Sequence, residues 1–237
     1  MSELPSPSFP PLLDGEAVRG DPFALAQARA AEGCDAGLIL YTISRARLRA
    51  AIVFAPEVPL SQAATMLITC GIGFSNALGA LAPPEVGVHL DWDGGIRVNG
   101  AHCGRLAMAA STHRPEDQPD WLVIGLTVSL ATDTDDPGLT PDQTSLLEEG
   151  CADIPPMRLL ESWARHTLVW LNRWLDDGPA PLAAEWRGMV HGIDAETTQT
   201  LDGAPLTGTF LGVDEDFGML LRTSTGTRSL PLTTLLS

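Results

Sequence analysis

The stretch Leu90–Ala110, LDWDGGIRVNGAHCGRLAMAA, carries the clearest local signal in this 237-residue chain. It reads as two short strands joined by the dipeptide Asn99-Gly100. Both central residues of a type I′ turn need a positive φ, and Asn-Gly tolerates this best. The sequence therefore predicts a tight β-hairpin with a two-residue loop, in which the cross-strand pairs are Val98–Ala101 and Arg97–His102.

Strand alternation then divides the side chains of this hairpin between the two faces of a sheet. One face is predicted to carry Asp91, Asp93, Arg97 and His102, and the other Trp92, Ile96, Cys103 and Arg105. Three glycines allow a ligand or another backbone to approach closely, or else serve sheet packing or a bulge: Gly94, Gly95 and Gly104. Asp91, Asp93 and His102 have the donor types of a metal site, but a solvated carboxylate pair with an ion-pairing histidine is the favoured interpretation, so no metal is predicted.

Composition limits the possible partners. The chain has 30 acidic and 14 basic residues and a net charge of −16, which excludes nucleic acid and anionic membrane as expected partners. All the basic residues are arginine, so no mechanism can use a lysine. Four scattered cysteines, no Cys-x-x-Cys pair and no secretory signal predict a cytoplasmic protein, and no apolar run is long enough for a membrane span.

Periodicity and turn residues give the remaining elements. Residues 1–20 are predicted to form an extended arm over the surface. Helices are expected at 22–32, 60–81, 157–175 and 183–189. The two long helices, 60–81 and 157–175, each have an apolar stripe, and Leu175 belongs to the stripe of the second. Strands are expected at 37–42, 49–55 and 121–130. After residue 190, short β-prone segments with frequent turns predict a small β-barrel.

This order of elements resembles the biotin–protein ligases of the biotin/lipoate ligase superfamily. Their hairpin reads approximately W-P-N-D-x-x-x-N-G-x-K-x-x-G-I-L, and Trp92, Asn99-Gly100 and Gly104 match it. Ile124-Gly125 resembles the family's I-G-x-G-I-N strand. The stretch GTFLGVDEDFGMLL resembles the family's C-terminal pattern at Gly208, Gly212, Asp214, Asp216, Gly218 and Leu220.

The resemblance implies an α+β fold of the class II aminoacyl-tRNA synthetase/biotin synthetase type, a mixed sheet with helices followed by a small SH3-like β-barrel. It implies an N-terminal arm at 1–20, a ligase-like domain at 21–178 and the barrel domain at 179–237. Such enzymes activate biotin with ATP and Mg²⁺ and pass the acyl group to a lysine of a biotin or lipoyl carrier domain. Sheet-edge homodimers occur among them, so a homodimer is expected on resemblance alone.

The chain departs from the family where chemistry is expected. The catalytic lysine falls at His102, or at Ala101 if the deletion is placed differently, and the Asn-Asp after the tryptophan becomes Gly94-Gly95. The family's G-R-G-R-x-G adenylate loop is replaced by Ser44–Arg49, which lacks glycine and therefore the flexibility of a phosphate-cradling lid. The family's asparagine at the end of the buried strand becomes Ser129.

Candidate residues follow from these matches. His102, Arg105 and Arg97 are the candidate catalytic residues, because they offer positive charge where the lysine is missing. The candidate ligand-binding residues are Trp92, Gly94, Gly95, Gly104, Arg45, Arg47, Arg49, Gly125 and Ser129. The sequence predicts a ligase-like protein with altered or lost catalysis; the alternative is a non-catalytic module that binds a small acyl compound or a carrier protein on the same fold.

Overall fold

The computed structural model describes residues 7–132, 140, 142–201 and 203–237. Its main sheet has seven strands in the order β1-β2-β3-β7-β6-β5-β4. Among the strand pairs that the structure describes in this sheet, β1–β2 is parallel and the other five are antiparallel, so the sheet is mixed. The strands are β1 (Asp14–Ala17), β2 (Leu38–Ile43), β3 (Arg47–Phe54), β4 (Val88–Leu90), β5 (Gly95–Val98), β6 (Ala101–Ala110) and β7 (Leu122–Ser129).

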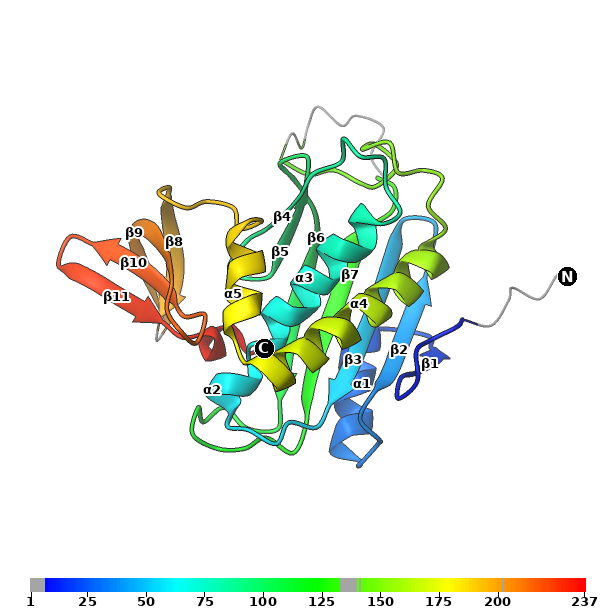
Figure 1. The fold of residues 1–237 in the computed structure, drawn as a ribbon, viewed down its shortest axis with the longest axis horizontal. Helices are drawn as coiled ribbons and strands as arrows, with labels where there is room; N and C mark the ends of the chain where they lie inside the picture. The colour runs from blue at the N-terminus through cyan, green and yellow to red at the C-terminus, as the bar shows by residue number, and fades with distance from the viewer. Residues whose placement is uncertain (1–6, 133–139, 141, 202) are drawn as a thin grey trace, which may run out of the picture.

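The helices form a layer on each face of this sheet. α3 (Met66–Gly79) and α4 (Pro156–Asp177) cross the front face, and α2 (Leu60–Ala63) and α5 (Ala180–Arg187) flank them (Figure 1). α1 (Pro22–Ala31) covers part of the opposite face, where Ala26 and Ala30 pack with Val53 and Val123. Asp21 caps α1, since its carboxylate accepts a hydrogen bond from the backbone nitrogen of Phe23.

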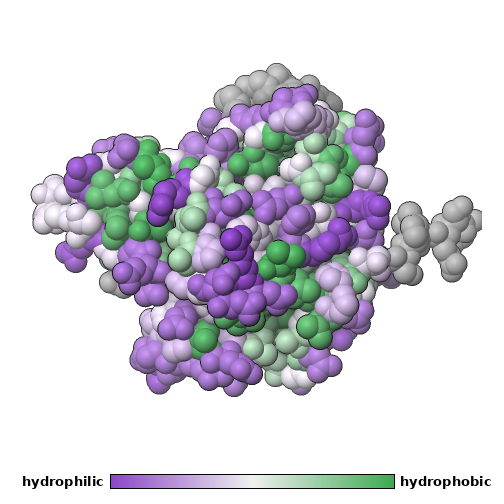
Figure 2. Space-filling view, in the orientation of Figure 1, coloured by the Kyte–Doolittle hydropathy of each residue, from purple (hydrophilic) through white to green (hydrophobic). Residues whose placement is uncertain are grey.

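Two helix predictions need correction. The helix expected over residues 60–81 is divided into α2 and α3, because Thr65 N bonds Gln62 O and Leu67 N bonds Ala64 O, which are tight three-residue steps rather than α-helical ones. In α4 the side chain of Leu175 is 63% exposed rather than inward. The front of the molecule is mostly hydrophilic, with hydrophobic residues grouped over the C-terminal sheet and near the middle of the helical layer (Figure 2).

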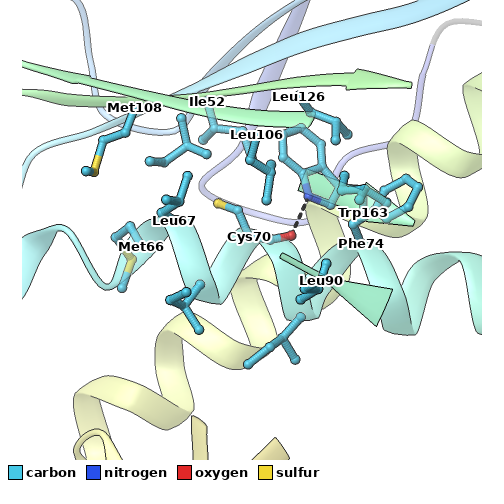
Figure 3. Close-up of a cluster of buried hydrophobic side chains, with 14 of the residues drawn as sticks. Ile52, Met66, Leu67, Cys70, Phe74, Leu90, Leu106, Met108, Leu126 and Trp163 are labelled. Atoms are coloured by element: carbon cyan, nitrogen blue, oxygen red, sulfur yellow. Dashed lines mark hydrogen bonds between the residues drawn. The ribbon is translucent and has the colours of Figure 1, made fainter. Parts of the chain in front are cut away.

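The core lies between the sheet and the α3–α4 layer. Apolar side chains of α3 meet those of β3, β6 and β7, and the indole Nε1 of Trp163 donates to the carbonyl of Cys70 at 3.0 Å (Figure 3). Gly73 allows α4 to approach closely, because a methyl group on Gly73 would lie 2.5 Å from Thr167 Oγ1. The front face of the sheet is thus largely filled by apolar side chains.

The C-terminal part is a four-stranded antiparallel sheet, as the β-prone segments predict. Its strands are β8 (Glu196–Leu201), β9 (Ala204–Val213), β10 (Met219–Thr223) and β11 (Gly226–Leu230), followed by a 3₁₀ turn, η2 (Leu232–Leu235). They lie in the order β11-β10-β9-β8, and within the described residues β11 does not pair with β8. Closure into an SH3-like barrel stays a prediction.

The hairpin joins the two sheets. The indole Nε1 of Trp92 donates to the carbonyl of Phe217 at 2.8 Å. Trp186 of α5 packs edge-on against Phe210 and Phe217. The C-terminal sheet therefore docks on the β4–β5 edge of the main domain. In the described part of the chain, no helix is both long and apolar enough to cross a membrane.

Candidate functional site

The predicted hairpin register is confirmed. Asn99 and Gly100 have φ values of 49° and 96°, as a type I′ turn requires. Val98 pairs with Ala101, and Arg97 pairs with His102. The two strands are β5 and β6, which are the second and third strands from the β4 edge of the main sheet.

The predicted face of Arg105 is wrong. Beyond the Arg97–His102 pair the register shifts, so that Ile96 pairs with Gly104 and Gly95 pairs with Arg105. Cys103 is the extra residue of a β-bulge, which breaks the strict alternation on which the prediction rested. Ile96 and Cys103 are buried in the α3–α4 core, whereas Arg105 is exposed. The bulge places Arg105 on the same face as Arg97 and His102.

One carboxylate organises the polar side chains of the hairpin. Arg97 Nε donates to both oxygens of Asp91, at 2.8 and 3.0 Å, and its Nη2 lies 2.7 Å from Nε2 of His102. His102 Nδ1 lies 3.5 Å from Asp91, and His191 Nδ1 lies 3.1 Å from it. Since a guanidinium can only donate, His102 accepts at Nε2 and carries its proton on Nδ1, facing Asp91.

Two further arginines, Arg49 and Arg105, lie on the same face of the sheet. Arg49 pairs with Thr127, and Thr127 pairs with Arg105, so these three side chains form one row across β3, β7 and β6. Arg49 and Arg105 line a pocket of about 140 Å³ together with Phe23, Ala107 and Gly125. Among the described residues neither guanidinium has an ion pair or a side-chain hydrogen bond, although Asp21 lies at the rim of the pocket.

The arginine-rich stretch is not a loop. β3 begins at Arg47, and only Ser44–Ala46 connect it to β2. Ser44 closes this turn, because its backbone nitrogen and hydroxyl both donate to the Arg47 carbonyl. Arg45 lies in the exposed turn, and Arg47 is exposed opposite Ser129 on β7. Of the three arginines, the structure brings only Arg49 to the pocket with Arg105.

The predicted ligand-binding residues of the hairpin contact other parts of the protein, whereas Gly125 on β7 lines a pocket. A methyl group on Gly94 would lie 2.7 Å from the Leu106 carbonyl, and one on Gly104 would lie 2.5 Å from the Thr127 carbonyl. Gly95 lies against the Asp91 carboxylate, and the Trp92 indole bonds the C-terminal sheet. Gly125 differs, because it lines the Arg49–Arg105 pocket.

The hairpin also carries a cysteine, Cys103, whose thiol is buried. Burial above all, and then the Glu149 carboxylate, raise the pKa of the Cys103 thiol to about 12, so this cysteine packs rather than reacts. In the portion of the chain that the structure describes, no three His, Cys, Asp or Glu side chains are grouped to hold a metal ion.

Two larger hollows lie elsewhere in the described part of the chain. One of about 350 Å³ lies between the hairpin and β8, lined by Asp91, His102, His191 and Glu196 among others. The other, of about 540 Å³, lies near Leu12 and Cys34 and contains none of the candidate residues. The sequence analysis did not identify His191 as part of the site and did not identify Asp91 as its central carboxylate. Asp91 could have been found from its place in the hairpin, but no local pattern indicates that a histidine 100 positions away contacts it.

Comparison with known proteins agrees with this fold. Residues 9–188 match the family described as "Biotin/lipoate A/B protein ligase family", and residues 196–237 match a domain of unknown function, DUF4444. A biotin--[acetyl-CoA-carboxylase] ligase of Paracoccus denitrificans is 23% identical over 182 residues, which are 76% of this chain and 75% of the relative.

Solved structures extend the comparison to nearly the whole chain. A biotin protein ligase-like protein of unknown function from Silicibacter sp. TM1040 is 56% identical, with a TM-score of 0.90, covering 98% of this chain and 100% of that one. The biotin protein ligase of Aquifex aeolicus in complex with biotin and ATP is 16% identical, with a TM-score of 0.68, covering 92% and 94%. The chain belongs to the biotin/lipoate A/B protein ligase family.

Proposed function

We propose that this protein binds a small acyl carboxylate on the open face of its main sheet and has lost the ligation reaction. The observation that carries the proposal is the row Arg49–Thr127–Arg105, which lines one pocket with two guanidinium groups and a hydroxyl between them. Guanidinium groups match the planar geometry of a carboxylate and donate charge-assisted hydrogen bonds to it. A single carboxylate is the simplest ligand for this row.

The apolar part of the pocket supports an acyl ligand. Beside the arginines the pocket is lined by Phe23, Ala107 and Gly125. A ligand with a charged end and an apolar body satisfies both parts of this lining. Biotin and lipoate are carboxylic acids of this kind, and the Aquifex aeolicus relative is in complex with biotin and ATP.

Two features support the loss of ligation. Of the two positions that the resemblance assigns to the family's lysine, Ala101 has no polar group, and the His102 ring is engaged by Arg97 and Asp91; the sequence holds no lysine that could replace it. The β2–β3 connection has three residues and no glycine, so it offers no flexible, glycine-rich lid over the phosphates of ATP. The residues present fit a carboxylate better than an acyl-adenylate.

One observation favours a second candidate, a diverged ligase. Arg97, His102 and Arg105 share one face, so three cationic or titratable groups are available where the family's lysine acts. In that case ATP, with Mg²⁺ bound to its phosphates, would be a substrate, and the product would be a biotinylated or lipoylated carrier domain. The relative of Paracoccus denitrificans, a biotin--[acetyl-CoA-carboxylase] ligase, makes such a carrier the natural partner to test.

Isothermal titration with hexanoate, biotin, lipoate and ATP, alone and in pairs, separates the two candidates. We expect a carboxylate to bind without ATP, and Arg49→Ala and Arg105→Ala each to weaken it by about 10- to 100-fold, as lost charge-assisted hydrogen bonds predict. Arg228→Ala, on the exposed strand β11, is the matched control and should leave the affinity unchanged. Release of AMP from ATP in the presence of biotin or lipoate would overturn the loss of ligation and establish the diverged ligase.

A further inference from the structure

Phe23 closes the apolar end of the pocket that holds Arg49 and Arg105. It is the second residue of α1, and its backbone nitrogen is fixed by the Asp21 cap. A methyl group built on Gly125 would lie 2.6 Å from Cδ2 and 3.0 Å from Cγ of the Phe23 ring. The ring therefore rests directly on the backbone of Gly125, where the sheet would otherwise be open.

The register of the sheet shows how little free surface remains. Three rows lie side by side across β3, β7 and β6 on this face: Arg49–Thr127–Arg105, Ala51–Gly125–Ala107 and Val53–Val123–Ala109. Neighbouring rows on one face are two residues apart, which is about 6.6 Å. Val53 and Val123, in the third row, are buried under α1. The middle row alone separates the cations from the helix, and it is itself largely covered, because Ala51 is buried with α1 and the Phe23 ring lies on Gly125.

From this arrangement we infer that Phe23 sets the length of the ligand and restricts the site to short, unbranched carboxylates, excluding bicyclic acids such as biotin. The inference rests on the proposed function, because it assumes that Arg49 and Arg105 hold the carboxylate. The spacing from the arginine row to the row that Phe23 covers corresponds to a chain of roughly four to six carbon atoms. The alkyl chain lies over Ala107 and ends against the Phe23 ring.

The volume of the pocket agrees with this limit. Pockets for drug-sized ligands measure about 300–1,000 Å³, whereas this one measures about 140 Å³. Because Gly125 and Ala107, which line the pocket, already have minimal side chains, the floor cannot be lowered further. Phe23 is the large side chain of the pocket, so its removal is the direct way to enlarge the site.

The test is titration of straight-chain carboxylates from acetate to decanoate, and of biotin, into the wild type and Phe23→Ala. In the wild type we expect the affinity to rise by about fourfold per methylene, equivalent to ~0.8 kcal/mol, up to hexanoate and to fall at octanoate. Phe23→Ala should shift the optimum to longer chains and raise the affinity for octanoate by about tenfold or more.

Leu25→Ala is the matched control, because Leu25 is a half-buried apolar residue of the same helix that does not line the pocket. Phe23→Leu keeps an apolar cover if the alanine variant folds poorly, and it should shift the optimum in the same direction by a smaller amount. Wild-type protein that binds octanoate or biotin as tightly as hexanoate would overturn the role of Phe23 alone. Binding of no carboxylate to the wild type or to either Phe23 variant would overturn the proposed function itself.

Discussion

Nη2 of Arg97 lies 2.7 Å from Nε2 of His102, across a directly paired position of the hairpin. The contact leaves the imidazole as an acceptor on one side and a donor toward Asp91 on the other. His102 is therefore a structural partner of Arg97, at one of the two positions, His102 and Ala101, to which the resemblance assigns the family's lysine.

Restoring that lysine should not restore ligation. His102→Lys places a second positive charge opposite Arg97, and like charges directly opposite in a sheet are destabilising. We expect urea denaturation to show a loss of about 0.5–1 kcal/mol and biotin-dependent AMP release to stay at background, because the lid is still missing. His102→Gln keeps an acceptor for Arg97 and serves as the control. AMP release by the lysine variant would show instead that the short β2–β3 turn is no obstacle.

Docking of the C-terminal sheet should depend on the indole of Trp92. Trp92→Phe removes the donor to the Phe217 carbonyl and leaves that buried carbonyl without it. The expected cost is about 1 kcal/mol in urea denaturation, with faster proteolysis after residue 188. Trp121→Phe is the control, since the half-buried Trp121 indole makes no hydrogen bond among the described residues. Equal stability of the two variants would show that this hydrogen bond does not stabilise the docking of the C-terminal sheet.

Close packing of α3 on α4 should make Gly73 intolerant of any side chain. Its added methyl group would lie 2.5 Å from Thr167 Oγ1 and 2.9 Å from Thr167 N. Gly73→Ala should therefore cost about 1–3 kcal/mol in the free energy of unfolding. Gly79→Ala, in the same helix with nothing within 4 Å, should be neutral or stabilising by up to ~1 kcal/mol. A neutral Gly73→Ala would mean that the two helices separate at little cost.

The reactivity of the cysteine thiols should follow their burial. Burial raises the pKa of Cys103 to about 12, so its reactive thiolate is scarce at pH 8 and grows about tenfold per pH unit up to that value. With iodoacetamide at pH 8, mass spectrometry should find the partly exposed Cys34 labelled first and Cys103 protected. All four cysteines should react in urea. Labelling of Cys103 as fast as Cys34 in the folded protein would contradict this.

The elements that local chemistry determines were predictable. Asn99-Gly100 determines a turn and a register through φ alone, and Asp21-Pro22 marks the start of α1. The motifs at Trp92, Gly104 and Gly125 indicate the family from the sequence, because the spacing of glycines marks where two backbones approach closely.

The candidate site was predictable only in part. The bulge at Cys103 depends on pairing with β5 and β7 together, which alternation along one strand does not report. Contacts of His191 and Phe23 arise from tertiary packing with residues 100 or more positions away. No local sequence pattern indicates such partners. Likewise, Arg49 and Arg105 lie in one row because each pairs with Thr127 on the strand between them.

The bulge in β6 has a consequence for how related sequences diverge. Chemistry on this face is set by the number of residues between Gly100 and Leu106, as much as by their identity. A relative with one residue more or fewer there would turn a different side chain toward Arg49, even with every other position conserved. A single-codon insertion or deletion in this hairpin is thus a one-step evolutionary route to a different site.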